Sequence, residues 1–327
     1  MLNIETIEVL KKSKNLLAFS AGVDSSALFF LLLEHNISFD IALINYETRE
    51  ASNEEEQHAI ELAKTYNLQC FTTKAPHFEN NFEKNARDFR YSFFDNLIEQ
   101  KGYDNLLTAH QLNDQLEWFL MRLTKGAGTT ELLGLEPISQ RKGYSVVRPL
   151  LSHSKEELLN YLEEHNHPYF VDKSNYEQKY ERNHFRATYS DQLIAEYREG
   201  IRRSFDYLRE DKSYLSDGYR ELYHEKELYI LQIDKPHVLV RAVDKYLKKL
   251  GYLISAGQRE ELKDGVSIVL AGVWAVALVE DRVFIAPYLK NPMPKEFKER
   301  CRKLKIPAKV RPYLLSEAID LERIKSE

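Results

Sequence analysis

Two polar segments of the chain combine residue types that could bind phosphate and move a proton. The first reads Ser-Ala-Gly-Val-Asp-Ser-Ser and lies between an apolar run and a helix-like run; its members are Ser20, Ala21, Gly22, Val23, Asp24, Ser25 and Ser26. Backbone N–H groups at a helix start, together with the helix dipole, suit an anion. Gly22 would let the backbone approach a ligand closely. The segment is therefore a candidate phosphate loop.

Asp24 is the informative residue of this loop. A carboxylate beside phosphates is repulsive unless a divalent cation lies between them, so Asp24 predicts Mg²⁺. The alternative is that the same residue types only turn the chain and cap a helix, and the spacing alone leaves both readings open. The segment contains no Gly-Lys-Ser/Thr, which excludes a Walker loop.

The second polar segment spans residues 107–117. Asp114 and Glu117 are three residues apart, so they project from the same face of a helix near its first turn. Two carboxylates there could hold a metal, bind a substrate ammonium group, or only stabilise the helix start. His110 just before them could bind phosphate, shuttle a proton, or play a structural role.

Both segments follow short apolar runs in an alternating pattern. Strands are predicted over Asn15–Phe19, Phe39–Tyr46, Gln69–Thr73 and Asn105–Ala109. Helical spacing separates them, over Ala27–Leu33, Glu54–Asn67, Phe82–Gln100 and Leu112–Leu123. This alternation predicts an α/β fold with a doubly wound, mainly parallel sheet. Ligands bind at the carboxyl ends of such strands, which is where both polar segments lie.

The regular alternation of strand-like and helix-like segments ends after Pro149. Ser154–His165 begins with a Ser-x-x-Glu capping box and is predicted to be helical. The charged, Tyr-rich segment Asp191–Glu227 has helical spacing and is interpreted as a linker. The remainder alternates short β-type runs with a helix near Val238–Leu250, which indicates a smaller α+β domain. The predicted division is a catalytic domain at 1–190, a helical linker at 191–227 and a C-terminal domain at 228–327.

Composition narrows the class of protein. The 327 residues carry a net charge of −5 and are 43% hydrophobic, without a biased tract. The two cysteines, Cys70 and Cys301, exclude a disulfide framework and a four-thiolate metal site. The longest uncharged stretch covers residues 265–279, shorter than the roughly 18 residues of a membrane span, and predicts a buried strand pair with Gly272 near the turn. We therefore expect a cytoplasmic protein with no membrane partner.

The phosphate loop resembles a known pattern. Ser-Gly-Gly-x-Asp-Ser after the first strand is typical of the N-type PP-loop ATPases, whose fold is adenine nucleotide alpha hydrolase-like. Ala21 stands where the motif has its first Gly. If Ala21 adopts a positive φ, the strain is about 1 kcal/mol or more.

The wider chain resembles the tRNA(Ile)-lysidine synthetases. Their central motif is roughly Leu-x-Thr-Ala-His-x-x-Asp-Asp-Gln-x-Glu-Thr. The chain matches it from Thr108 to Trp118, except that Asn113 replaces the first Asp and Trp118 replaces the final Thr. Supporting segments follow the family's order; they lie at 81–91, 147–151, 172–175 and 182–186. The resemblance covers residues 15–190.

The resemblance implies an ATP-dependent carbon–nitrogen ligase. Such an enzyme adenylates the C2 oxygen of the wobble cytidine in a CAU-anticodon tRNA(Ile), and L-lysine then displaces AMP. It implies ATP binding by residues 20–26 and His110, and Mg²⁺ held by Asp24. Arg90 would offset charge near the α-phosphate. Asp114 and Glu117 would bind lysine, and Arg182 and Arg186 would contact the tRNA backbone or the reacting nucleotide. A homodimer is compatible with the family.

Rival interpretations remain open at this point. The first rival interpretation is another PP-loop tRNA-modifying enzyme, although the two cysteines cannot supply the paired Cys-x-x-Cys motifs of cytidine thiolation enzymes. A degenerate ATP- or tRNA-binding module without catalysis is the other, motivated by Ala21 and Asn113. Nine Lys and Arg against two Glu in residues 290–311 predict a phosphate-tracking surface despite the acidic total, unless this stretch is only a solvated helix face.

Overall fold

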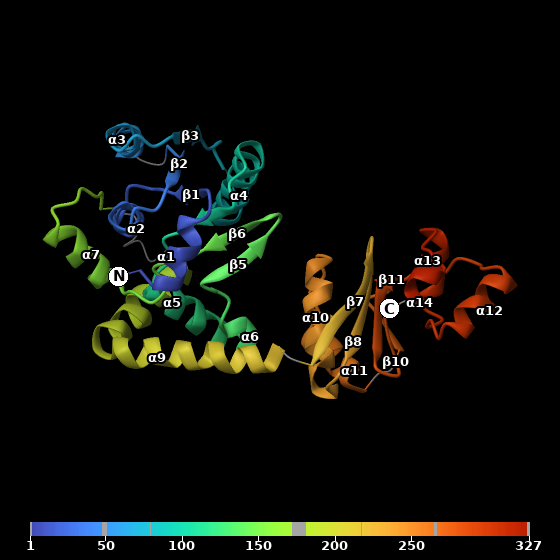
Figure 1. The fold of residues 1–327 in the computed structure, drawn as a ribbon. Coiled ribbons are helices and arrows are strands. Elements are labelled where there is room, and N and C mark those ends of the chain that lie inside the picture. The colour runs from blue at the N-terminus through green and yellow to red at the C-terminus, as the bar shows by residue number, and fades with distance from the viewer. Residues whose placement is uncertain are drawn as a thin grey trace. The chain divides into compact units, whose positions relative to one another are not determined.

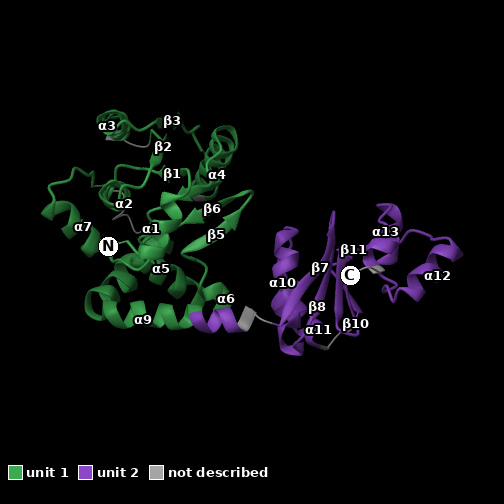
Figure 2. Ribbon diagram, in the orientation of Figure 1, with its two compact units in different colours: residues 1–209 green, residues 210–327 purple. Residues whose placement is uncertain are grey.

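The computed structural model describes residues 2–47, 51–78, 80–171, 181–216, 218–264 and 267–325. The chain divides into two compact units, residues 1–209 and residues 210–327 (Figure 2). Each unit has its own sheet and its own core.

The first unit alternates helices and strands. In chain order these are α1 (Ile4–Lys11), β1 (Asn15–Ala18), α2 (Val23–Glu34), β2 (Phe39–Asn45), α3 (Ala51–Thr65), β3 (Cys70–Lys74), α4 (Phe82–Lys101), β4 (Asn105–Leu107), α5 (Leu112–Leu123), α6 (Thr129–Leu132), β5 (Ile138–Arg141), β6 (Tyr144–Val147), α7 (Lys155–Glu164), α8 (Glu181–Phe185), the π-helix η2 (Arg186–Ser190) and α9 (Asp191–Ser216).

The sheet of this unit has the strand order β3-β2-β1-β4-β6-β5. All neighbouring pairs are parallel except β5 with β6, which form an antiparallel edge. Leu17 of β1 lies between Ile41 of β2 and Leu107 of β4, so the carboxyl ends of β1 and β4 are adjacent. The predicted doubly wound, mainly parallel sheet is confirmed.

Apolar side chains cover both faces of this sheet. Helices α1, α2, α3 and α7 bury one face in a core that includes Leu17, Phe29 and Leu158. Helix α4 covers the opposite face through Phe94, Leu97 and Ile98, and Figure 1 shows the two layers on either side of the strands. Burial on both faces explains why these strands read as continuous apolar runs.

The second unit is built on an antiparallel sheet with the strand order β7-β8-β11-β10-β9. Its elements are β7 (Tyr219–Glu225), β8 (Leu228–Ile233), the 3₁₀-helix η3 (Pro236–Val238), α10 (Leu239–Lys249), α11 (Ala256–Asp264), β9 (Ser267–Leu270), β10 (Trp274–Val279), β11 (Arg282–Pro287), α12 (Lys295–Lys303), α13 (Arg311–Ser316) and α14 (Leu321–Lys325). Helices α10 and α11 cover one face and α12–α14 the other. The predicted strand pair around Gly272 is confirmed as β9–β10, with Gly272 at φ +72° in the turn.

The helix predicted over Asp191–Glu227 is wrong beyond Ser216. Residues Tyr219–Glu225 form strand β7, which pairs with β8. The register shifts between Glu221 and Tyr223, so a bulge interrupts the two-residue alternation that marks a strand. The division between the two units falls after Arg209, inside the segment interpreted as a linker.

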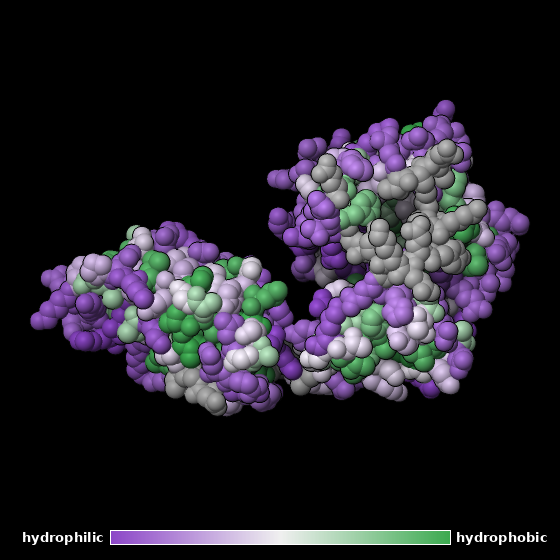
Figure 3. Space-filling model, turned by 180° about the vertical axis from the view of Figure 1, so that it is seen from behind, coloured by the Kyte–Doolittle hydropathy of each residue, from purple (hydrophilic) through white to green (hydrophobic). Residues whose placement is uncertain are grey.

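The surface is largely hydrophilic on the face shown in Figure 3, with separate apolar patches on each unit. Among the helices of the described ranges, none has the length and apolar character needed to cross a bilayer.

Candidate active site

The phosphate loop joins the end of β1 to the start of α2. Gly22 is the N-cap of α2 in an extended conformation and provides no side-chain cap. Ala21 lies in the left-handed region at φ +58°, so the condition under which the sequence implied strain is met. The loop thus directs the N-terminus of a helix toward the edge of the sheet, the arrangement that binds anions.

The serines of this loop stabilise its backbone. The Ser25 hydroxyl donates to the carbonyl of Gly22 at 3.1 Å, and the Ser26 hydroxyl donates to the carbonyl of Ala21 at 3.2 Å. The Ala21 carbonyl also accepts from the Phe170 N–H at 2.8 Å. Ser20 remains exposed, with its hydroxyl 3.1 Å from that of Ser25. These bonds hold Ala21 in the conformation that its side chain disfavours.

Asp24 lies in the first turn of α2 with an unsatisfied carboxylate. Its Oδ1 atom is buried and has no hydrogen-bond partner among the described residues. Burial raises the pKa of Asp24 to about 7, and the negative charge of Asp114 adds to the shift. A buried oxygen without a partner fits a Mg²⁺ ligand. No cluster of three His, Cys, Asp or Glu side chains forms in the described ranges, so phosphate and water oxygens would complete the coordination.

Asp114 and Glu117 lie near the start of α5, which follows the end of β4. Asp114 accepts the backbone N–H of Gln111 at 3.1 Å, in a capping box that fixes the helix start. The side chain of Asp114 is 10% exposed and that of Glu117 only 2%. Two buried acids therefore lie beside the phosphate loop.

Arg182 and Arg186 bind these two acids directly. Arg182 donates to Asp114 at 2.8 Å and also to Glu117, while Arg186 donates to Asp114 at 3.0 Å and to Glu117 at 2.9 Å. The arginines come from α8 and η2, which pack against α5. We call these four residues the ion quartet. Two acids and two arginines leave it without net charge, and the Arg182 side chain is 45% exposed against 19% for Arg186.

The quartet separates the pKa values of its acids. Burial disfavours the Asp114 carboxylate, but Arg182, His110 and Arg186 outweigh it and hold the pKa of Asp114 below its usual value. Burial dominates at Glu117, where it raises the pKa despite both arginines. Acids with diverging pKa values are typical of sites that transfer protons, because one stays charged while the other accepts a proton.

His110 and Arg90 lie outside the quartet. Burial lowers the pKa of His110 to about 4, so its ring is neutral near pH 7, and its Nδ1 atom is 2.9 Å from the Thr108 hydroxyl. Arg90 on α4 is exposed and donates to the Tyr46 hydroxyl at 3.1 Å. Its charge still acts on His110, so the two side chains lie within electrostatic range of each other.

Lys155 is a candidate that the sequence interpretation missed. It begins α7, and its positive charge lowers the pKa of Asp24 against the larger effect of burial. Its backbone N–H donates to Asn113 Oδ1 at 3.2 Å. The sequence did contain a signal for Lys155, because the Ser154 capping box marks a helix start directly before it, after the Arg-Pro-Leu segment.

The segment at 172–175, which supported the family resemblance, lies outside the described residues.

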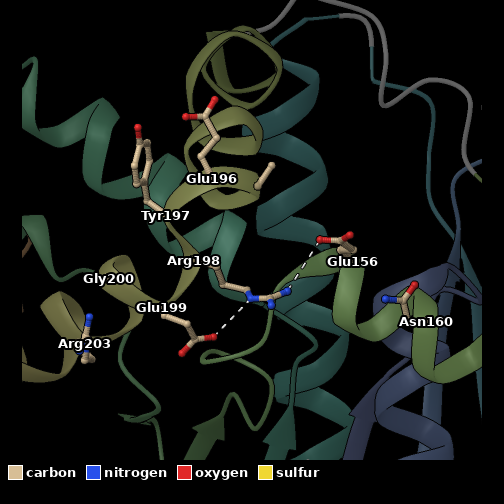
Figure 4. Close-up of a pocket in the computed structure, with 9 residues that line it drawn as sticks. Glu156, Asn160, Glu196, Tyr197, Arg198, Glu199, Gly200 and Arg203 are labelled. Carbon is tan, nitrogen blue, oxygen red and sulfur yellow. Dashed lines mark ion pairs between the residues drawn. The ribbon is translucent and has the colours of Figure 1, made fainter.

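A pocket of about 710 Å³ lies where α9 kinks at Tyr197. Figure 4 shows Arg198 between Glu156 and Glu199 on the wall of this pocket. It contains none of the predicted site residues.

The basic stretch at 290–311 is largely paired within the second unit. Arg302 pairs with Glu299, Lys305 with Glu280 at 2.6 Å and Arg300 with Glu322 at 3.7 Å. Lys309 and Arg311 donate to backbone carbonyls. The side chains of Lys295, Lys298 and Lys303 on α12 form no hydrogen bond or ion pair with any part of the chain that the structure describes.

Comparison with known proteins gives consistent matches. The PP-loop domain family matches residues 2–193. A tRNA(Ile)-lysidine synthase of Campylobacter jejuni strain RM1221 is 44% identical over 98% of both chains, and that of Wolinella succinogenes is equally similar over the same shares. The Helicobacter pylori strain 26695 protein of the same name is 42% identical over 95% of this chain and 92% of its own.

Among solved structures, a U34-tRNA thiolase of Methanococcus maripaludis with its [4Fe-4S] cluster superposes with a TM-score of 0.51. It is 18% identical, and the alignment covers 63% of this chain and 79% of the thiolase. The likeness concerns the fold alone.

Proposed function

The chain belongs to the tRNA(Ile)-lysidine synthase family of PP-loop proteins, and from this premise we propose how its own residues divide the reaction. The enzyme uses ATP to ligate lysine to C2 of the wobble cytidine in the CAU-anticodon tRNA(Ile), releasing AMP and pyrophosphate. The observation that carries the proposal is the adjacency of β1 and β4. It brings the phosphate loop and the ion quartet to the same edge of one sheet.

The phosphate loop serves the adenylation step. The N-terminus of α2 binds the pyrophosphate portion of ATP, with Gly22 and Ser20 at its surface. Mg²⁺ held by Asp24 would neutralise charge on the leaving pyrophosphate. Arg90 offsets charge near the α-phosphate, and neutral His110 donates or accepts a hydrogen bond there without adding charge.

The ion quartet serves the lysine step. The half-exposed Arg182 gives way to the incoming ammonium group, because it loses less burial than Arg186 on leaving the acids. Asp114 keeps its negative charge and binds the ammonium group. Glu117, whose pKa is raised, takes the ammonium proton, because only the neutral amine attacks.

Bond changes in this step balance without a further reactant. The lysine nitrogen bonds to C2 of the adenylated cytidine, and the bond between C2 and the activated oxygen breaks. AMP leaves with that oxygen. The nitrogen loses two protons in all: the ammonium proton moves to Glu117 before the attack, and the second proton leaves with the AMP phosphate after it. Arg182, released from the acids, and Arg186 then lie within reach of the nucleotide phosphate.

Further assignments complete the proposal. Residues 1–190 form the catalytic domain, and residues 228–327 bind tRNA through the basic side chains of α12. The amine substrate is L-lysine, the metal is Mg²⁺, the protein acts in the cytoplasm, and a homodimer is the assembly that the family suggests.

The test incubates the full chain with ATP, labelled L-lysine and CAU-anticodon tRNA(Ile), with and without Mg²⁺. Lysine incorporation with one AMP released for each lysine supports the proposal. Bound ATP without incorporation favours a nucleotide-binding module. Incorporation of sulfur in a parallel reaction, in which a sulfur donor replaces lysine, favours another PP-loop tRNA-modifying enzyme.

A further inference from the structure

Asn113 connects three segments of the first unit. Its side chain is buried at the start of α5. Its Oδ1 atom accepts the Lys155 N–H at 3.2 Å, and its Nδ2 atom donates to Asp191 Oδ1 at 2.7 Å. The backbone N–H of Lys155 can only donate, so the amide orientation is determined and the nitrogen must face Asp191.

Asp191 occupies the junction of two helical segments. It is the C-cap of the π-helix η2 and the first residue of α9. Arg186, which binds both acids of the ion quartet, is the first residue of the same π-helix. The Asn113–Asp191 bond thus anchors one end of the turn whose other end carries an arginine of the site.

A π-helical turn requires such an anchor. The π-helix is rare because its wide turn has poorer internal contacts than an α-helix, and it often occurs at functional sites. Relaxation to an α-turn removes one residue from the turn, which rotates the following residues by about 100° relative to the preceding ones. Fixing Asp191 against α5 prevents that slip and keeps Arg186 over Asp114 and Glu117.

We propose that Asn113 and Asp191 are positioning residues that hold η2 in its π-helical form, and thereby hold Arg186 on the ion quartet, in the lysine step. The inference rests on the proposed function of the quartet. It also explains why an amide stands at position 113: a carboxylate there would face the Asp191 carboxylate and could not donate to it.

The exchange of donor and acceptor tests the pair. Asn113→Asp removes the donor. Combining it with Asp191→Asn reverses the bond, since the amide introduced at position 191 can donate to one oxygen of the new carboxylate at position 113 while the other oxygen accepts the Lys155 N–H. The matched control is Asn96→Asp, the same change at an exposed residue of α4. Thermal unfolding of every variant excludes loss of the fold.

We expect Asn113→Asp to lower kcat/KM for lysine by about 10- to 100-fold while KM for ATP stays within about threefold. The double variant should recover to within about threefold of wild type, as should the control. A single variant that behaves like the control, or a double variant as impaired as the single one, overturns the inference.

Hydrogen exchange of the amides at 186–192 provides a second readout that does not need the ligase reaction. Exchange should become faster in Asn113→Asp and return to the wild-type rate in the double variant. If wild type incorporates no lysine, the proposed function fails, and the exchange rates alone decide whether the pair anchors η2.

Discussion

The indole of Trp118 lies where a side chain at position 134 would begin, so a Cβ atom added to Gly134 would overlap the Trp118 ring. The Trp118 Nε1–H donates to the Glu131 carbonyl at 3.2 Å, and the Arg122 guanidinium lies 4.4 Å from the ring centroid. This contact packs α6 and the residues after it against the helix that carries Asp114 and Glu117. Trp118, which departs from the family motif, thus has a defined structural role.

Gly134→Ala should therefore destabilise the first unit by about 1–3 kcal/mol, because the indole must move or the backbone must shift. Thermal or urea unfolding measures the loss. In a Trp118→Thr background, which removes the ring, the same change at Gly134 should have a smaller effect. An equal loss in both backgrounds would show that the ring is not what excludes a side chain there.

Asp24→Asn should stabilise the metal-free protein at about pH 8 by about 1–4 kcal/mol. The folded protein raises the pKa of Asp24 from 3.8 to about 7 through burial, so it binds more protons than the unfolded chain between these values. Stability consequently falls as pH rises through this interval, and the penalty is complete above about pH 7. Unfolding midpoints at several pH values, measured for wild type and variant, test whether the stability contributed by Asp24 falls as pH rises.

The same variant should lose its response to Mg²⁺. Wild type should gain thermal stability on Mg²⁺ addition with ATP present, and Asp24→Asn should not, together with loss of turnover. Asp88→Asn, at an exposed site on α4, is the matched control and should behave like wild type. A variant that keeps the Mg²⁺ response would remove Asp24 from the metal site.

Arg182→Ala should lower KM for lysine while lowering kcat by about tenfold or more. The incoming ammonium then competes with Arg186 alone for Asp114 and Glu117, but the transition state loses a positive charge near the phosphate. Steady-state kinetics over a range of lysine concentrations separates the two effects, with Arg203→Ala on α9 as control. A raised KM for lysine would contradict the exchange between Arg182 and the substrate.

Charge reversal at Lys298 and Lys303 should weaken tRNA binding. It should also reduce the slope of the logarithm of the binding constant against the logarithm of salt concentration, by about one unit for each phosphate that is no longer bound. These side chains on α12 have no ion pair within the described ranges, so their charge is available to phosphate. Binding curves at several salt concentrations make the measurement, and Lys263→Glu on α11 provides the charge change of one such substitution elsewhere in the unit. An unchanged slope would exclude α12 from the tRNA surface.

The sequence predicted the phosphate loop more fully than it predicted contacts between distant segments. Residues 20–26 could be assigned to a helix start because the apolar run, the glycine and the serines are contiguous. The sequence left the sign of φ at Ala21 open, and the structure has φ +58° there. Strand β7 could not be recognised, since its bulge and its charged residues hide the alternation.

The ion quartet illustrates what local patterns omit. Arg182 and Asp114 are separated by 68 residues, and nothing in either segment indicates that the two bind each other. Motif resemblance assigned lysine to the acids and RNA to the arginines, as independent sites. Their pairing depends on the path of α8 and η2 across α5, which only the folded chain specifies.

That sequence separation has a consequence for how the enzyme acquires activity during synthesis. In a nascent chain that has released α5 from the ribosome but not Arg182 and Arg186, Asp114 and Glu117 lack the counter-charges that offset their burial in the folded protein. The central strands β1, β2 and β4 can pair earlier, because they precede both arginines in the chain. Closing the long loop back to α5 is then a late step of folding. Competence to process tRNA therefore arises only once most of the first unit has been translated.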